Sequence, residues 1–184
     1  MMNKALRTLI LYNGIFVLAW GLFGPLYAVY VQKLGGQIFI ISLSWSVFLV
    51  ASTLTTFIIS RFGDRVQEQE YFLLSGFLLR AVVWIMYIFV PNIQFLIILQ
   101  IILGIGDALG SPAFDSLVAE HLDKGRHMAE YSDMKILFNL SNALATIVGG
   151  VIASQLGFTY LFILMAILSM VSFFGILFKP RSLL

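Results

Sequence analysis

The chain has 184 residues, of which 60% are hydrophobic and only 11% are charged, and its formal net charge at pH 7 is +2. A chain this apolar leaves no room for a soluble domain, and without cysteine it can form neither a disulfide framework nor a thiolate metal site. The basic residues form no cluster beside an aromatic platform, so we expect no nucleic acid among its partners.

Six long apolar stretches alternate with charged or turn-rich breaks. Each is long enough to cross a bilayer, which takes about 20 mostly apolar residues in a helix. In chain order, the predicted helices span residues 9–31, 38–60, 71–90, 93–118, 136–156 and 159–178. We therefore predict an all-α membrane protein, with residues 1–184 as a single six-helix transmembrane domain and the lipid bilayer as its first partner. The first stretch is too long for a signal peptide, so we expect the first helix to be retained.

The basic residues outside the stretches lie almost entirely on one side of this predicted bundle. Lys33 alone stands on the other side, and Arg80 lies inside the third stretch. Basic loops stay in the cytoplasm during membrane insertion. We therefore predict cytoplasmic termini, cytoplasmic loops at 61–70 and 119–135, and an integral protein of the cell (plasma) membrane.

Two segments of the first half resemble two segments of the second half, in the same order. Residues 19–31 align with residues 106–118, with Pro25 on Pro112, and residues 58–63 align with residues 152–157. These matches indicate two related units of three helices. Because each unit crosses the membrane an odd number of times, the second unit must be inverted relative to the first. A 3+3 inverted repeat is typical of transporters whose working site lies near the membrane midplane.

Short motifs in three places resemble the major facilitator superfamily. Ser60, Asp64 and Arg65 keep part of the signature in the loop between its second and third helices, whereas residues 67–69 replace the glycine and basic pair of that signature. Residues 20–25 and 104–120 are similar to its first and fourth helices. The resemblance implies the N-terminal six-helix half of a major facilitator fold and a secondary transporter. Since the chain also lacks a nucleophile–base pair and a phosphate-binding glycine loop, we expect no enzyme, catalytic residue, metal site or cofactor.

Superfamily members have two six-helix halves, with the transport cavity between them. This sequence ends at Leu184, soon after its sixth predicted helix. Because an even number of helices puts two copies in the same orientation, we expect a parallel homodimer to supply both halves. A second six-helix half on another polypeptide and a piece of a longer protein are the alternatives.

Polar and aromatic side chains recur at helical spacing, and such side chains within a bilayer turn toward the bundle or a cavity. From this pattern we predict the substrate-binding residues Asn13, Trp20, Tyr27, Gln100, Asn139 and Asn142. The resemblance implies that the third and sixth helices lie outside the cavity. Amides and aromatic rings suit a sugar or a drug-like molecule as small-molecule substrate, moved by alternating access, with proton coupling left open. The alternative function is a non-transporting membrane subunit.

Two charged residues lie deep within predicted helices. Asp107 is a candidate proton carrier, and Arg80 is its candidate partner in a structural ion pair. Both lie roughly 10–18 Å from the cytoplasmic ends of their helices at 1.5 Å per residue, so their depths allow them to meet. The two roles of Asp107 stay open at this point. The resemblance implies one further charged site, a cytoplasmic gate formed by Asp64 and Arg65 against the other half.

Overall fold

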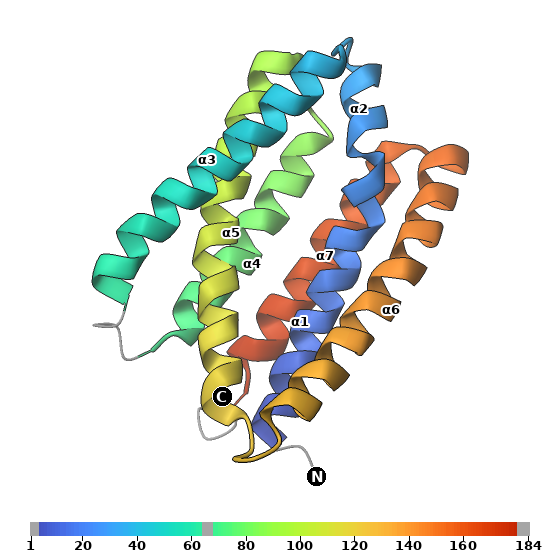
Figure 1. Cartoon of the computed structure of the whole chain (residues 1–184). Coiled ribbons are helices and arrows are strands. Elements are labelled where there is room, and N and C mark those ends of the chain that lie inside the picture. The colour runs from blue at the N-terminus through green and yellow to red at the C-terminus, as the bar shows by residue number, and fades with distance from the viewer. Residues whose placement is uncertain (1–3, 64–67, 180–184) are drawn as a thin grey trace.

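The computed structural model describes residues 4–63 and 68–179, which are helical and contain no strand (Figure 1). The elements are α1 (Lys4–Phe23), the 3₁₀-helix η1 (Gly24–Leu26), α2 (Tyr27–Lys33), α3 (Ile38–Phe62), α4 (Glu70–Tyr87), α5 (Ile93–His121), α6 (His127–Gln155) and α7 (Phe158–Leu177). Because α1, η1 and α2 follow one another as one span, the described residues contain six helices long and apolar enough to cross a membrane. The predicted all-α class is confirmed.

The observed helices differ from the predicted ranges mainly at their ends. The first span begins at Lys4 and is interrupted at Gly24–Leu26. α6 begins at His127, so residues 127–135, predicted as part of a cytoplasmic loop, are helical. The reason is that hydropathy marks only the part of a helix that lies within the bilayer, whereas the helical backbone can continue beyond it. Met134 is buried, so this early part of α6 still packs on the bundle.

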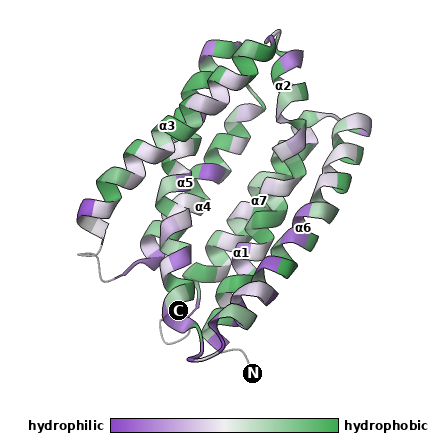
Figure 2. Cartoon of the chain, in the orientation of Figure 1, coloured by the Kyte–Doolittle hydropathy of each residue, from purple (hydrophilic) through white to green (hydrophobic). Residues whose placement is uncertain are grey.

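The six spans form one bundle, with α4 and α7 packed together behind α5 and α1 in the view of Figure 1. α3 packs on α5 at one edge, and α6 packs on α1 at the opposite edge. The contacts are symmetric between the two halves of the chain, with α1, α3 and α4 corresponding to α5, α6 and α7. Under this correspondence the α3–α5 contact matches the α6–α1 contact, and the α4–α7 contact matches itself. α1 begins and α7 ends at the same end of the bundle, which we call the terminal end. Figure 2 shows many of the hydrophilic residues gathered there.

Glycine permits the closest of the contacts between helices. A Cβ atom on Gly76 of α4 would lie 2.7 Å from the Cα atom of Gly110 on α5. A Cβ atom on Gly149 of α6 would collide with the backbone of Leu22 on α1. In a bilayer, where no hydrophobic effect drives helices together, small residues at such contacts let the backbones pack closely. These contacts hold α5 beside α4 and α6 beside the first span.

Aromatic rings fill the bundle near the end opposite the terminal end. The rings of Phe23, Tyr30, Tyr87 and Phe162 are in mutual contact, with centroids 5.0–5.8 Å apart. The Tyr30 hydroxyl donates a hydrogen bond of 2.7 Å to the Tyr87 carbonyl. Edge-on and tilted ring contacts add stability beyond the area that they bury. The cluster joins the first span to α4 and α7 and fixes the position of Tyr87.

Candidate functional site

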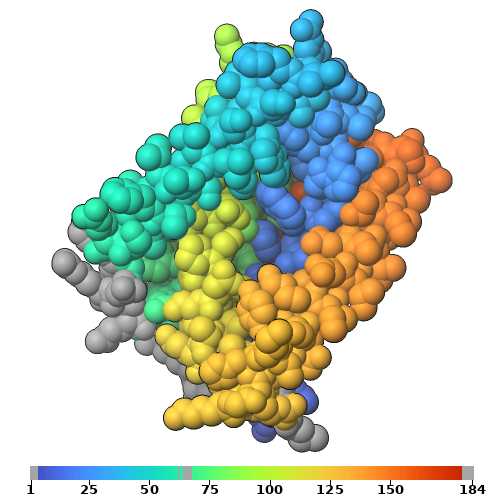
Figure 3. Space-filling view, viewed as in Figure 1, coloured from blue at the N-terminus to red at the C-terminus, as the bar shows by residue number. Residues whose placement is uncertain are grey.

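One broad face of the bundle is hollowed between α3, α5, the first span and α6 (Figure 3). The two helices at its edges, α3 and α6, are the least enclosed spans, with 11% and 17% of their apolar stretches buried. A solute or a second protein unit can therefore reach the bundle from this face.

Pro25 interrupts the first span beside this face. Proline has no backbone N–H, so it cannot donate to the carbonyl of Gly21 four residues earlier, and the helix changes to the 3₁₀-turn η1. The Thr146 hydroxyl on α6 donates a hydrogen bond of 3.3 Å to that carbonyl. Gly24 and Pro25 are exposed at the break. Irregular backbone at membrane depth occurs where protein or a cavity surrounds it, so the break indicates a cavity wall.

Two adjoining cavities lie at the break and share Gly24, Tyr27 and Trp45. The first, which we call the open cavity, has a volume of about 320 Å³ and lies between residues 24–28 of the first span and residues 41–45 of α3. The second, which we call the enclosed cavity, has a volume of about 10 Å³ and also contacts Trp20, Tyr87 and Gln100. Three of the predicted substrate residues, Trp20, Tyr27 and Gln100, therefore meet at the enclosed cavity.

Gln100 is the least satisfied polar residue at the enclosed cavity. It lies on α5 and is 1% exposed. Within the described ranges, neither atom of its amide has a hydrogen-bond partner of good geometry, although the amide lies near the Tyr27 hydroxyl. Tyr27 donates instead to Ser44 Oγ at 2.6 Å. The Gln100 amide is thus available to a ligand.

The other predicted substrate residues do not line these cavities. Asn142 lies on α6 against Gly21, and a Cβ atom on that glycine would meet its amide oxygen. Asn139 is exposed on α6, and Asn13 is half-buried on α1. A substrate role for these three amides stays a prediction.

Asp107 and Arg80 form an ion pair within the bundle. Arg80 Nη1 on α4 lies 3.6 Å from Asp107 Oδ1 on α5, and the two side chains are 4% and 32% exposed. Ser52 and Ser111 donate hydrogen bonds of 3.2 and 3.1 Å to the Asp107 carboxylate. The Arg80 guanidinium lies 4.2 Å from the centroid of the Phe16 ring on α1, within the range of a cation–π contact. The structure contains the predicted ion pair, and a proton-carrier role for Asp107 stays a prediction.

The structure adds residues that the sequence pattern did not single out. Tyr87 on α4 lines the enclosed cavity, although the resemblance implied that the third helix lies outside. Ser52 on α3 binds the Asp107 carboxylate. The predicted gate residues Asp64 and Arg65 lie outside the described residues, so the gate stays a prediction.

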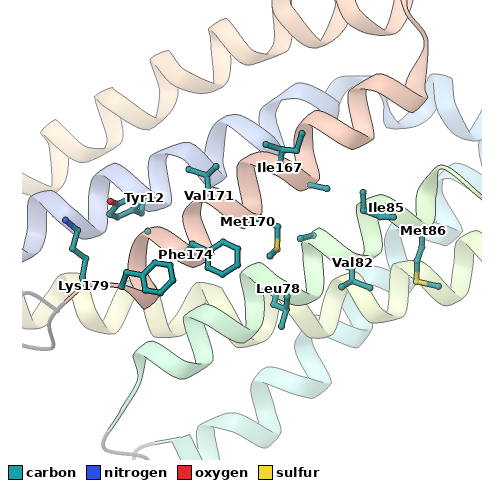
Figure 4. A pocket seen from close by; sticks show the side chains of 14 residues that line it. Tyr12, Leu78, Val82, Ile85, Met86, Ile167, Met170, Val171, Phe174 and Lys179 are labelled. Atoms are coloured by element: carbon teal, nitrogen blue, oxygen red, sulfur yellow. The ribbon is translucent and has the colours of Figure 1, made fainter.

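A larger cavity, of about 950 Å³, lies between α1, α4 and α7 (Figure 4). Its walls are aliphatic and aromatic side chains such as Leu78, Val82 and Phe174, with Tyr12 and Lys179 at one end. Leu78 and Val82 belong to the exposed side of α4. A groove that offers so few hydrogen-bonding groups suits lipid chains better than a polar solute, so we do not place the substrate there.

An all-helical bundle of six apolar spans, with a broken first span and a cavity beside the break, is typical of an integral membrane protein of the transporter type. The family model described as the Major Facilitator Superfamily matches residues 9–183, and the chain belongs to this superfamily. Its members are generally transporters and not enzymes. A comparison with curated proteins gives no significant match. The predicted resemblance is confirmed, as is the fold class of six helices forming one half of a major facilitator fold.

Proposed function

We propose that the protein transports a small organic solute, of the sugar or drug-like class, across the plasma membrane by alternating access. The main support is the enclosed cavity, where Trp20, Tyr27 and the unpaired Gln100 amide meet beside the break in the first span. Broken helices beside a site at membrane depth recur in secondary transporters. The test is solute flux into proteoliposomes, followed by light scattering, because osmotic swelling reports any uncharged solute without a label.

The proposal includes a parallel homodimer as the working unit. Asn139 is exposed on α6, and the Asp107 side chain is 32% exposed at membrane depth. Leaving such groups against lipid is costly, which favours a second six-helix unit over the hollowed face. A two-fold axis along the membrane normal through this face would bring α3 of one copy against α6 of the other, because these helices form its opposite edges (Figure 1). Cross-linking between α3 and α6 therefore tests the assembly.

We further propose a 3+3 inverted repeat, with the terminal end of the bundle in the cytoplasm. The symmetry of the contacting helix pairs supports the repeat, and the hydrophilic terminal end supports the cytoplasmic orientation. Because the chain has no cysteine, single cysteines introduced at Gln37 and Lys124 can be labelled without background. A membrane-impermeant maleimide should reach Gln37→Cys from outside intact cells and Lys124→Cys only after the cells are opened. The reverse pattern would overturn the orientation.

For Asp107 we propose the role of counter-ion to Arg80 and not that of proton carrier. Arg80 is 3% exposed, so protonating Asp107 would leave a buried guanidinium without its counter-ion. Asp107→Asn keeps the size of the side chain and removes its charge. Solute uptake by this variant should respond to an imposed proton gradient as the wild type does. A folded Asp107→Asn protein that loses gradient-driven uptake would overturn the proposal.

A further inference from the structure

Two polar groups at the enclosed cavity lack a hydrogen-bond partner of good geometry within the described part of the chain. They are the amide of Gln100, at both its oxygen and its nitrogen, and the hydroxyl of Tyr87. Each residue is 1% exposed. The neighbouring phenols differ, because the Tyr30 hydroxyl donates to the Tyr87 carbonyl and the Tyr27 hydroxyl donates to Ser44. An unpaired hydroxyl, that of Tyr87, and a paired one, that of Tyr30, therefore lie in one aromatic cluster.

Unpaired polar groups at this depth need an explanation. The bilayer core supplies no water to satisfy them, and a buried donor or acceptor without a partner destabilises the fold. Apolar side chains of similar size, such as methionine and phenylalanine, would pack at both positions without that penalty. The presence of an amide and a phenol at one cavity therefore indicates a partner that comes from outside the chain.

The cavity lining restricts the chemistry of this partner. Among the residues that the structure describes, no charged side chain lines the enclosed or the open cavity, so a charged group would find no counter-charge there. The Gln100 amide offers both a donor and an acceptor, and the Tyr87 hydroxyl can act as either. A hydroxyl group has the same dual character. The enclosed volume of about 10 Å³ holds one group of about the size of a water molecule.

The open cavity gives room for the rest of the molecule. Its volume of about 320 Å³ lies at the small end of the range for ligand pockets, which is about 300–1,000 Å³. It shares Tyr27 and Trp45 with the wall of the enclosed cavity, and the rings of these residues offer flat apolar surfaces. A ring-shaped polyol has an apolar face of C–H bonds that can lie on such rings while its hydroxyls point outward.

We propose that Gln100 and Tyr87 together bind one hydroxyl of a neutral, ring-shaped polyol whose ring lies in the open cavity against Trp45. Tyr87 is thereby a specificity-determining residue. This assignment rests on the proposed function and names the substrate class of that same site.

Binding to the whole chain in lipid nanodiscs tests the assignment directly. The probes are D-glucose and myo-inositol, the singly deoxygenated analogues of D-glucose, and D-glucuronate as the charged control. Tryptophan emission is the readout, because Trp20 and Trp45 line the cavities. We expect saturable binding of at least one neutral polyol, none of D-glucuronate, and at least about tenfold weaker binding when the hydroxyl that enters the cavity is absent. Failure of both neutral polyols to bind, or equal binding of every deoxygenated analogue, would overturn the assignment.

Variants without ligand separate this role from a structural one. Gln100→Met and Tyr87→Phe should weaken polyol binding at least about tenfold, while the unfolding temperature of the empty protein stays the same or rises. Tyr30→Phe is the matched control, because it removes a hydrogen bond that is made, and its unfolding temperature should fall. If Gln100→Met lowers the unfolding temperature as much as Tyr30→Phe, the amide is held by a permanent structural water and the assignment is wrong.

The outcome also distinguishes this assignment from the proposed function. If the protein transports a charged or fully apolar solute, and Gln100→Met and Tyr87→Phe transport it at the wild-type rate, the proposed transport function stands and the polyol site is wrong. Polyol binding that needs Gln100 and Tyr87, without flux of any solute in proteoliposomes, would keep the site and overturn transport.

Discussion

Removing the Asp107 carboxylate should destabilise the bundle strongly. In Asp107→Ala, the Arg80 guanidinium keeps its buried position, 4% exposed, and loses the carboxylate at 3.6 Å. Breaking a buried ion pair by removing one partner costs about 3–5 kcal/mol. Because the Asp107 side chain is 32% exposed, water can approach the cation from that side. We therefore expect a loss of about 3 kcal/mol, at the lower end of that range.

The free energy of unfolding can be measured by titrating sodium dodecyl sulfate into protein in mild detergent and following tryptophan emission. Ser52→Ala is the control, because it removes one hydrogen bond of 3.2 Å to the same carboxylate and should cost only about 1 kcal/mol. The double variant Arg80→Leu/Asp107→Leu should be more stable than Asp107→Ala, since no charge stays buried without a partner. Equal stability of Asp107→Ala and Ser52→Ala would refute this reasoning.

Two further predictions concern packing and assembly. Gly149→Ala should lower the free energy of unfolding by about 1–3 kcal/mol, because its methyl group would collide with the first span. Gly150→Ala is the control and should change the free energy of unfolding little, because a Cβ atom at Gly150 would stand in open space. Similar unfolding curves for the two variants would contradict the close contact. Cysteines at Leu49 and Leu144, which are exposed on α3 and α6, should form a cross-link between two copies when each copy carries only one of them. If neither this pair nor neighbouring exposed pairs at the same depth on α3 and α6 form a cross-link, the parallel homodimer is contradicted.

Hydropathy predicts the membrane-spanning helices more completely than prolines predict where a helix is interrupted. Length and apolarity predict the spans, because a bilayer admits little except helices of that length. The break at Pro25 depends on more than the proline. Pro112, aligned with it in the sequence, lies inside α5 without interrupting the helix. The Gly21 carbonyl, which Pro25 leaves without its helical donor, accepts from Thr146 on another helix, and a single sequence does not contain such a contact.

The candidate site could be predicted in part. Trp20, Tyr27 and Gln100 stand out as polar or aromatic residues in apolar helices, and the structure brings them to one cavity. Tyr87 did not stand out, because a tyrosine at the end of a helix also fits the aromatic belt at a membrane surface. Its relation to Gln100 depends on how α4 crosses α5, which the glycine contacts determine. For Arg80, estimated depth along the helices allowed the pairing with Asp107, and the structure contains it.

Solute flux in proteoliposomes tests the central claim most directly. Vesicles that contain the protein are mixed rapidly with an excess of an uncharged solute, and light scattering follows their shrinkage and recovery beside protein-free vesicles. A transporter for a neutral polyol should speed the recovery in D-glucose or myo-inositol relative to protein-free vesicles, and the gain should fall in Gln100→Met. Recovery that equals the protein-free rate for every solute tested would contradict transport and favour a non-transporting membrane subunit.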